Sequence, residues 1–464
     1  MTNRCTENPL NLGAPILDTT ARFAWVVLCE LQRELFSGAE KDITTYSKKG
    51  QVYMGNFLGV LQQIQEIVWG PPTMILLLIT GFYYTLRLGF LQFIHLPKAI
   101  RYIFEKEEGG GVGDVSAFAS LCTALAATIG TGSIVGVATA LRVGGPGALF
   151  WMWVSAILGM ATKYAEGVLA IKYRSIDENG EVAGGPMYYI EQGMGSKWKW
   201  LAKIFAFFGV CVGLFGIGTF SQVNGIASAI QNFFDPNKVH TVAIPGIGTY
   251  SWTVVIASLI LAFCVGAVLI GGIKRIASVS QIVVPFMAVA YFVFALILII
   301  CNITKVPAAV VTVVQGAFHP RAVTGGVVGS MFVAMQNGVA RGIFSNEAGL
   351  GSAPIAAAAA QTHEPVRQGL VSMTGTFIDT IVICTLTGLS IVLTGAWQVD
   401  GLEGVQVTTY AFQNGLPFPA QISSFVLMLC LVFFAFTTIL GWDYYSERCL
   451  EYLSGGNMKH VKIF

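Results

Sequence analysis

Nine stretches of this chain are each apolar over about 20 residues, the length that a helix needs to cross the hydrocarbon core of a bilayer. They run approximately over 68–90, 117–141, 147–172, 201–231, 252–271, 276–302, 322–360, 369–395 and 421–446. The composition agrees, because 54% of the residues are hydrophobic and only 11% are charged, whereas soluble domains carry about 25% charged residues. The sequence therefore predicts an all-α, polytopic membrane protein.

The basic residues alternate along the chain. Lys and Arg gather after the odd-numbered stretches, for example at Lys98, Arg101 and Lys274, and are sparser after the even-numbered ones. Because cytoplasmic loops hold the excess of Lys and Arg, this pattern predicts a cytoplasmic C-terminus. The formal net charge is only +2, so we predict no nucleic-acid partner. The HExxH, GxSxG and GxxxxGK[ST] motifs are absent from the sequence, so we predict neither an enzyme nor a bound cofactor.

The beginning of the chain differs from the rest. Residues 1–53 mix basic and acidic side chains and contain no stretch long enough to span a bilayer. Chain termini are usually loose unless they are tied down. We therefore expect an N-terminal extension over 1–53 and one membrane domain over 54–464.

The second apolar stretch is interrupted by glycine. Residues 123–137 read TALAATIGTGSIVGV, and each glycine weakens a helix by about 1 kcal/mol relative to alanine. A helix broken at mid-membrane is tolerated where its backbone lines a cavity or binds a ligand, and transporters use such breaks to hold substrates and ions. Close packing through small residues explains the same pattern, so both interpretations stay open here.

The seventh stretch contains a second interruption. Residues 341–354 read RGIFSNEAGLGSAP, which places Arg341, Asn346 and Glu347 beside Gly349 in an apolar segment. Paired interruptions in two halves of a chain point to a transporter's binding site, and a charge inside the membrane is a functional candidate. Arg341 and Glu347 are either gating residues or a structural pair that neutralise each other.

Other polar residues lie inside apolar stretches. Lys163 and Glu166 stand three positions apart on one helical face, which favours a local ion pair. Asp379 has no basic residue near it in the sequence, so it is a cation ligand, a gate or a hydrogen-bonding partner of a neighbouring helix. The adjacent hydroxyls of Thr437 and Thr438 are of the kind a sodium site needs, although Thr often bonds to its own helix.

Several long strings resemble a known family. They are GGPGALFWMWVSAILG from Gly144, MATKYAEGVLAIKYR from Met160, GGPMYYIEQG from Gly184, FSNEAGLGSAPIAAAAA from Phe344 and VSMTGTFIDT from Val371. From about residue 68 onward the chain resembles the sodium:alanine, or alanine or glycine:cation, symporter family. The resemblance implies the leucine-transporter-like fold of the amino acid–polyamine–cation superfamily, with one leading helix and a five-plus-five inverted repeat. It also implies symport of alanine or glycine with sodium across a bacterial or archaeal cytoplasmic membrane.

The resemblance also assigns residues. It places the broken helices at 129–133 and 344–351, with substrate between them. The implied substrate contacts are Ile129, Gly130, Thr131, Gly132, Ser133, Gln222, Phe344, Asn346 and Gly349. Superfamily analogy places sodium between the carbonyls of Ala126 and Ile129 and the hydroxyls of Thr437 and Thr438.

Two departures from the family pattern accompany these expectations. Ser133 stands where the family usually has Asn, and the chain ends after the ninth stretch, so the last two helices are expected to be missing. The expected partners are a small amino acid, sodium and lipid, with no obligate protein partner. A proton-coupled or exchange carrier is the alternative within transport. A channel is the alternative from another class, and it would need no paired broken helices.

Overall fold

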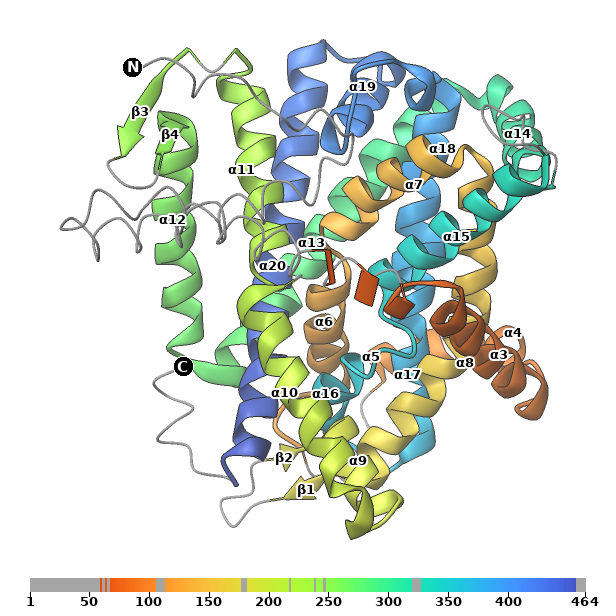
Figure 1. Cartoon of the computed structure of the whole chain (residues 1–464), viewed down its shortest axis with the longest axis vertical. Coiled ribbons are helices and arrows are strands. Elements are labelled where there is room, and N and C mark those ends of the chain that lie inside the picture. Colours follow the sequence, from red (N-terminus) through yellow and green to blue (C-terminus); the bar gives the residue numbers. More distant parts are fainter. Residues whose placement is uncertain are drawn as a thin grey trace, which may run out of the picture.

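A computed structural model describes most of the membrane domain. It covers residues 59–60, 63–64, 67–105, 113–176, 182–216, 218–237, 239–244, 248–318 and 327–455. The expected extension over 1–53 and the last residues, 456–464, lie outside the described ranges. The described part is a bundle of helices with two short hairpins (Figure 1), which confirms the all-α class.

The helices follow the apolar stretches closely. Their bounds are α3 Pro71–Arg87, α4 Leu91–Ile94, α5 Leu96–Phe104, α6 Ala117–Thr128, η1 Gly132–Gly136, α7 Val137–Gly144, α8 Gly147–Lys172, α9 Pro186–Gly193, η2 Ser196–Trp198, α10 Lys199–Phe215, α11 Phe220–Phe234, α12 Trp252–Leu269, α13 Gly272–Cys301, η3 Ile303–Lys305, α14 Val306–Phe318, α15 Val327–Asn346, α16 Ala353–Ala358, α17 Pro365–Thr376, η4 Phe377–Cys384, α18 Thr385–Thr394, η5 Ala396–Gln398, α19 Val405–Gly415 and α20 Ala420–Leu453. The hairpins are β1 Ser175–Ile176 with β2 Val182–Ala183, and β3 Thr241–Ile244 with β4 Gly248–Ser251, both antiparallel.

Fewer helices pass a strict spanning test than the nine predicted stretches. Six described helices are long and apolar enough to cross a membrane, or seven if α6 and the η1–α7 segment count as one bent span. The first stretch forms α3, which has 17 residues. The seventh stretch divides into α15 and α16, because residues 347–352 leave the helical conformation. The described helices that pass the test are therefore fewer than the nine predicted stretches because the helices at some predicted positions are short or broken.

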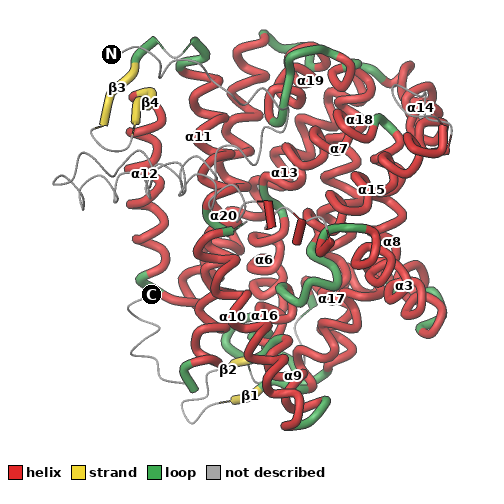
Figure 2. The backbone as a smooth tube through the Cα atoms, viewed as in Figure 1, coloured by secondary structure: helices red, strands yellow, loops and turns green. Residues whose placement is uncertain are grey.

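The exposure of the outer helices fits a lipid environment. No residue of α12 is buried, and its Phe263 is 77% exposed. Such a surface would be a liability in water but suits lipid tails, which are as apolar as the side chains themselves. The helix lies at the edge of the bundle (Figure 2).

Two long helices organise the interior. Helix α8 packs against α3, α15, α16 and α17, whereas α20 packs against α6, α10, α11 and α13. Small residues permit close contact: a Cβ on Gly147 would lie 2.2 Å from the Gly316 carbonyl oxygen. Broken helices α6–α7 and α15–α16 lie between α8 and α20, so both breaks sit in the middle of the protein (Figure 1).

Candidate functional site

The two helix breaks meet inside the bundle. Helix α6 ends at Thr128, and the chain resumes at η1 with a bend of 50° between the two halves. Helix α15 ends at Asn346, and α16 begins at Ala353. The Oγ atoms of Ser133 and Ser345 lie 3.2 Å apart, and a Cβ on Gly132 would be 3.3 Å from the Ser345 Cα atom. Two segments separated by about 200 residues are thus in direct contact at their breaks.

The first break is surrounded by close neighbours. The Thr131 amide donates to Gln222 Oε1 on α11 at 3.2 Å. A Cβ on Gly130 would lie 2.4 Å from Thr438 Oγ1 and 3.2 Å from Gln222 Oε1. Glycine is therefore required at this position so that backbone, amide oxygen and hydroxyl can approach one another.

The two candidate sodium-binding threonines have different surroundings. Thr438 Oγ1 lies 3.0 Å from the Ala126 carbonyl oxygen and 3.5 Å from that of Ile129, so α20 reaches the end of α6. Thr437 Oγ1 instead donates to the Phe433 and Phe434 carbonyls of its own helix and contacts Met287 Sδ on α13 at 3.5 Å. The structure brings three of the four expected sodium ligands together and leaves Thr437 on another face of α20.

The second break has an unusual backbone. Glu347 has φ 56°, Gly349 has φ 84° and Gly351 has φ 79°. Residues other than glycine rarely adopt this left-handed backbone conformation, because it costs them about 1–3 kcal/mol. The Ser352 hydroxyl donates to Glu347 Oε2 at 2.6 Å, and the Ala348 amide donates to Asn346 Oδ1 at 2.9 Å. Short local bonds therefore stabilise the strained segment.

Charged side chains of α8 hold both ends of this segment. Lys163 Nζ donates to the Asn346 carbonyl at 2.8 Å, where α15 ends, and Glu166 Oε1 accepts from the Gly351 amide at 3.0 Å, where α16 begins. A cation at a helix C-terminus and an anion at an N-terminus complement the helix dipoles. The predicted Lys163–Glu166 ion pair is wrong, because among the described residues no such pair lies within 4.0 Å. Lys163 and Glu166 each bond to the backbone of the break instead of to one another.

The pairing of Arg341 with Glu347 is also absent from the described contacts. The Arg341 guanidinium lies over the Phe344 ring at 5.7 Å, a cation–π contact, while Glu347 is bonded to Ser352. Arg341 stacks on a ring of α15, whereas Glu347 stabilises the left-handed turn that follows this helix. The two side chains therefore do not form the structural pair that was one of the two predictions for them.

Asp379 joins the two breaks. Its Oδ1 accepts from Ser133 at 2.7 Å and from Ser345 at 3.0 Å, and its Oδ2 accepts from Thr380 at 2.8 Å. The carboxylate is completely buried in the π-helical turn η4. Sequence reasoning singled out Asp379 and Ser133 but missed Ser345 and Thr380, although each is adjacent in sequence to a residue that it selected, Asn346 or Asp379.

Not every expected substrate residue faces the meeting point. A Cβ on Gly349 would strike Leu77 of α3 at 2.7 Å, so this glycine faces α3 and α8. Phe344 does lie near the first break, since its Cδ1 would be 3.4 Å from a Cβ on Gly132. The Asn346 amide Nδ2 donates to Thr380 Oγ1 at 3.1 Å, which places it beside Asp379.

Two cavities border this region. One of about 10 Å³, room for about one water molecule, lies between α6, α8, α16 and α17, and Lys163 and Gln368 line it. Another of about 300 Å³ lies between α11, α19 and α20 and is lined by polar side chains, among them Asn232, Thr409 and Gln413. Helix α19 also contacts the first break, because Thr408 Oγ1 donates to the Ile134 carbonyl at 3.3 Å.

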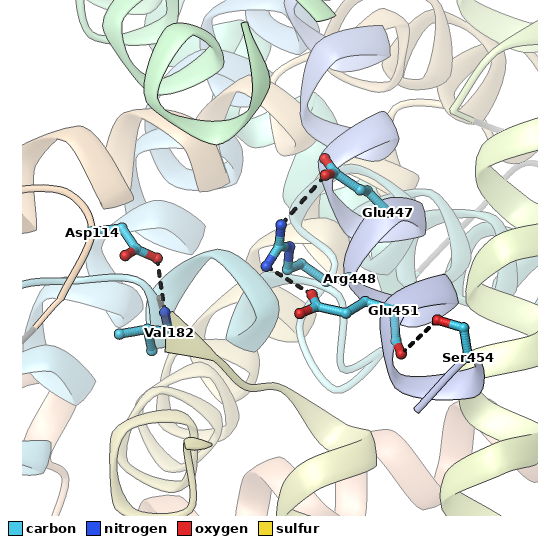
Figure 3. A network of polar contacts seen from close by, with 6 residues as sticks. All are labelled: Asp114, Val182, Glu447, Arg448, Glu451 and Ser454. Atoms are coloured by element: carbon cyan, nitrogen blue, oxygen red, sulfur yellow. Dashed lines mark hydrogen bonds and ion pairs between the residues drawn. The ribbon is translucent and has the colours of Figure 1, made fainter. Parts of the chain in front are cut away.

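A polar network occupies the far end of α20 (Figure 3). Arg448 lies 2.7 Å from Glu451 Oε2 and 3.4 Å from Glu447 Oε1, and the Val182 amide donates to Asp114 at 3.2 Å. These contacts gather the end of α20, strand β2 and the segment before α6 on one side of the bundle (Figure 3). They lie apart from the helix breaks: these Arg448 contacts stay within α20, and the Val182–Asp114 bond joins β2 to the segment before α6.

Comparison with known proteins places the chain among transporters. A sequence model of the sodium:alanine symporter family matches residues 54–464. The chain is 57% identical to an uncharacterized transporter of Haemophilus influenzae over 87% of its length and 84% of that protein. It is 48% identical to the sodium/alanine symporter AgcS of Methanococcus maripaludis over 88% of its length and 86% of that protein.

A solved structure shares the fold at low sequence identity. The crystal structure of MhsT in complex with L-phenylalanine superposes with a TM-score of 0.52 and 13% identity, over 76% of this chain and 77% of that one. At this identity the likeness concerns the fold alone. It confirms the expected leucine-transporter-like architecture.

Proposed function

Because this chain belongs to the sodium:alanine symporter family, we propose that it is a secondary symporter that carries alanine or glycine together with sodium. Membership in a transporter family already makes it a multi-pass membrane protein and not an enzyme. The assignment of alanine or glycine as substrate and of sodium as coupling ion is a proposal beyond family membership. This assignment is supported chiefly by one observation, the contact between the two helix breaks in the buried middle of the bundle.

The amino acid binds between the breaks. Unwound backbone offers amide groups to a carboxylate and carbonyl groups to an ammonium, as in other transporters with broken helices. The segment 129–133 provides such backbone, while Gln222, Phe344 and Asn346 border it. Space at Gly130 and Gly132 is restricted by Thr438 and Phe344, which favours a substrate with a very small side chain.

Sodium binds where α20 meets α6. The carbonyls of Ala126 and Ile129 and the hydroxyl of Thr438 offer three neutral oxygens within a short distance, and hard cations prefer oxygen ligands. Ile129 departs from helical geometry, with ψ 88°, so its carbonyl leaves the regular direction of the α6 carbonyls and points toward Thr438 of α20. An ion at this position would fix the end of α6 and thereby preorganise the substrate site.

Transport proceeds by alternating access, with the bundle that holds the breaks rocking against its surroundings. The charge pattern of the loops supports a cytoplasmic C-terminus. The Arg448 network would then lie on the cytoplasmic side, and the cavity of about 300 Å³ beside α19 on the outer side. The Arg448 network and this cavity lie at opposite ends of α20, which fits the two sides of the membrane to which a transporter must open in turn.

The decisive experiment is radiolabelled alanine uptake into proteoliposomes with imposed gradients. We expect an inward sodium gradient at equal pH to drive accumulation, and an imposed proton gradient without sodium to drive none. Accumulation driven by protons alone would establish the proton-coupled alternative. Exchange of internal for external alanine without either gradient would establish an exchange carrier.

A substitution localises the site in the same assay. Gly130→Leu should abolish uptake, since even its Cβ would collide with Thr438. Gly266→Leu on the lipid-facing helix α12, where an added Cβ meets nothing within 4 Å, is the matched control. Both variants should insert into the membrane. Normal uptake by Gly130→Leu would remove the first break from the binding site.

A further inference from the structure

The turn η2 and the start of α10 carry alternating lysine and tryptophan side chains that the proposed transport mechanism does not use. Residues 197–203 read KWKWLAK. The longer stretch 192–234, which includes all of α10 and α11, contains these three lysines and no Asp or Glu. The segment is therefore basic, and no acidic residue of its own two helices balances the charge.

The three lysines differ in their partners. Lys199 donates to Glu191 Oε1 of α9 at 2.7 Å, and Glu191 also accepts from Tyr452 of α20. Lys197 and Lys203 are exposed, and within the described ranges neither has a carboxylate oxygen within 4.0 Å. Two ammonium groups can therefore contact an anion from outside the protein.

The two tryptophans of this segment are exposed and lie against each other. The rings of Trp198 and Trp200 stack with their centroids 6.2 Å apart and their planes at 26°, and Trp200 is 57% exposed. Tryptophan is enriched at membrane–water interfaces, because one part of its ring system is apolar and its N–H group is polar. A stacked pair between lysines therefore fits the level of the lipid headgroups.

An apolar face continues from this pair along α10. The residues four, seven and eight positions after Trp200 share its side of the helix and are exposed; they are Ile204, Phe207 and Phe208. Lys203 stands three positions after Trp200 and four before Phe207, so it lies on the same side. A lysine there lays its stem along the apolar surface and extends its charge to the headgroups. The surface therefore offers a charged, an aromatic and an apolar region in the order in which a phospholipid presents phosphate, glycerol and acyl chains.

The lysine–tryptophan surface, residues 197–203, lies at the end of the bundle that we propose to be cytoplasmic. Helix α9 packs against η2 and α10, and α10 packs along α20 (Figure 1). Anionic lipids of the cytoplasmic leaflet attract basic segments, with an affinity gain of about fivefold for each Lys or Arg near the surface. An acidic protein would account for the lysines but not for the exposed Phe207 and Phe208 farther along α10.

We propose that the lysine–tryptophan surface binds an anionic phospholipid such as phosphatidylglycerol. The ammonium groups of Lys197 and Lys203 contact the phosphate, the stacked rings lie beside the glycerol, and the acyl chains cover α10 from Ile204 onward. The inference takes its membrane orientation from the proposed function and adds a lipid that acts on the transporter.

The bound lipid would act through α9. Lys199, within the surface, is bonded to Glu191 of α9, which also accepts from Tyr452 at the end of α20. At its other end α9 begins with Pro186, whose ring lies 2.7 Å from a Cβ built on Gly351 of the second break. A headgroup that holds the start of α10 therefore stabilises the contacts among α9, α10 and α20 beside that break.

Lipid binding can be measured without transport. Phospholipids with brominated acyl chains quench tryptophan fluorescence on close approach, and they can be titrated into the purified full-length protein in a neutral detergent. We expect brominated phosphatidylglycerol to bind more tightly than brominated phosphatidylcholine, because only the former carries a net charge. High salt should reduce the preference, since exposed charges are screened. Trp198→Phe combined with Trp200→Phe should remove most of the quenching at low lipid concentration.

Charge variants then assign the headgroup site. Lys197→Gln combined with Lys203→Gln should weaken phosphatidylglycerol binding by about 25-fold, about fivefold for each lysine, and leave phosphatidylcholine binding unchanged. The matched control removes two exposed basic residues at the start of α13, on the same predicted side of the membrane: Lys274→Gln combined with Arg275→Gln. It should retain the preference. Phosphatidylglycerol should also raise the unfolding temperature of the wild type and of this control, but not that of the Lys197/Lys203 variant.

Several results would overturn the proposal. Equal affinity for the two lipids, or an equal loss in the two charge variants, removes the site. Displacement of phosphatidylglycerol by soluble glycerol phosphate would show that the surface recognises phosphate alone. Tight binding of poly-glutamate without a preference between the lipids would assign the surface to an acidic protein. Selective binding that leaves the unfolding temperature unchanged would refute the action through α9.

The lipid site and the proposed transport function can fail separately. Selective lipid binding by a protein that carries no alanine would leave the lipid site in place and refute the proposed substrate. Sodium-driven alanine uptake by a protein without selective lipid binding would support the proposed function and refute the lipid site.

Discussion

The two helix breaks use glycine for different purposes. Gly130, Gly132 and Gly136 of the first break have no positive φ, and the first two serve close approach to Thr438 and to Ser345. In the second break Gly349 and Gly351, together with Glu347, adopt left-handed φ angles. One break is thus a point of contact and the other is a strained turn.

The support of the two breaks differs correspondingly. Around the first break, neutral groups such as Gln222 and Thr438 make the contacts. Around the second, charged residues of α8 hold each end, and Arg174 beyond the end of α8 donates to the carbonyls of Ala358 and Ala360 at 2.9 and 2.8 Å. A break held by neutral contacts can move when an ion or substrate binds. The second break is held at both ends by Lys163 and Glu166, which we call the charged clamp, and these bonds keep it fixed. We infer that the first break is the responsive element and the second is the frame.

The largest effect should come from breaking this frame. Lys163→Met removes a buried cation from the Asn346 carbonyl and leaves Glu166 and Glu347 uncompensated, which should destabilise the protein by about 3–5 kcal/mol. Thermal unfolding in detergent measures it. The control is Lys172→Met at the exposed end of the same helix. Equal unfolding temperatures for Lys163→Met and the wild type would show that the clamp does not hold the second break.

Next in size is the backbone strain of the second break. Gly351→Ala forces a side chain into φ 79° and toward Pro186 at 2.7 Å, which should cost about 1–3 kcal/mol. Gly136→Ala in the first break has φ −63° and open space around the added Cβ, so it should stabilise the protein by up to about 1 kcal/mol. If both variants unfold at the same temperature, glycine does not have different roles in the two breaks.

Much of this architecture could be predicted from the sequence because it depends on local pattern. Apolar length located the spans, and glycine density located both breaks. The partners of Lys163 could not be predicted, because helical spacing favours Glu166 while the actual acceptor is a carbonyl 183 residues away that becomes available only when α15 ends. Asp379 likewise collects hydroxyls from separate segments. Neither contact leaves a periodic signal in the sequence.

The responsiveness of the first break can be tested through its two threonines. Thr438→Ala removes the hydroxyl near the Ala126 and Ile129 carbonyls and should raise half-saturating sodium for alanine uptake by about tenfold. Thr437→Ala is the matched control, because that hydroxyl bonds to its own helix and approaches Met287. It should leave sodium dependence nearly unchanged. An equal shift in both variants would mean that both hydroxyls reach the ion.

The smallest expected effect tests whether the frame extends to the surface. Helix α9 begins at Pro186, which packs behind Gly351, and its Glu191 accepts hydrogen bonds from Lys199 at 2.7 Å and from Tyr452 at the end of α20. These bonds, chiefly the one from Lys199, hold the pKa of Glu191 below its ordinary value. A carboxyl group with a lowered pKa in the folded state stabilises the protein above its unfolded pKa, about 4.3, and that contribution disappears as the pH falls through the folded pKa.

Glu191→Gln should therefore lower the unfolding temperature slightly at pH 7, by an amount that corresponds to less than about 1 kcal/mol for a partly exposed pair. The difference between Glu191→Gln and the wild type should shrink as the pH is lowered below 4, since the wild-type carboxyl then becomes neutral as well. Thermal unfolding of both proteins at several pH values measures this. A gap of constant size at every pH would show that the side chain acts by shape and not by charge, and α9 would then have no electrostatic part in the frame behind the second break.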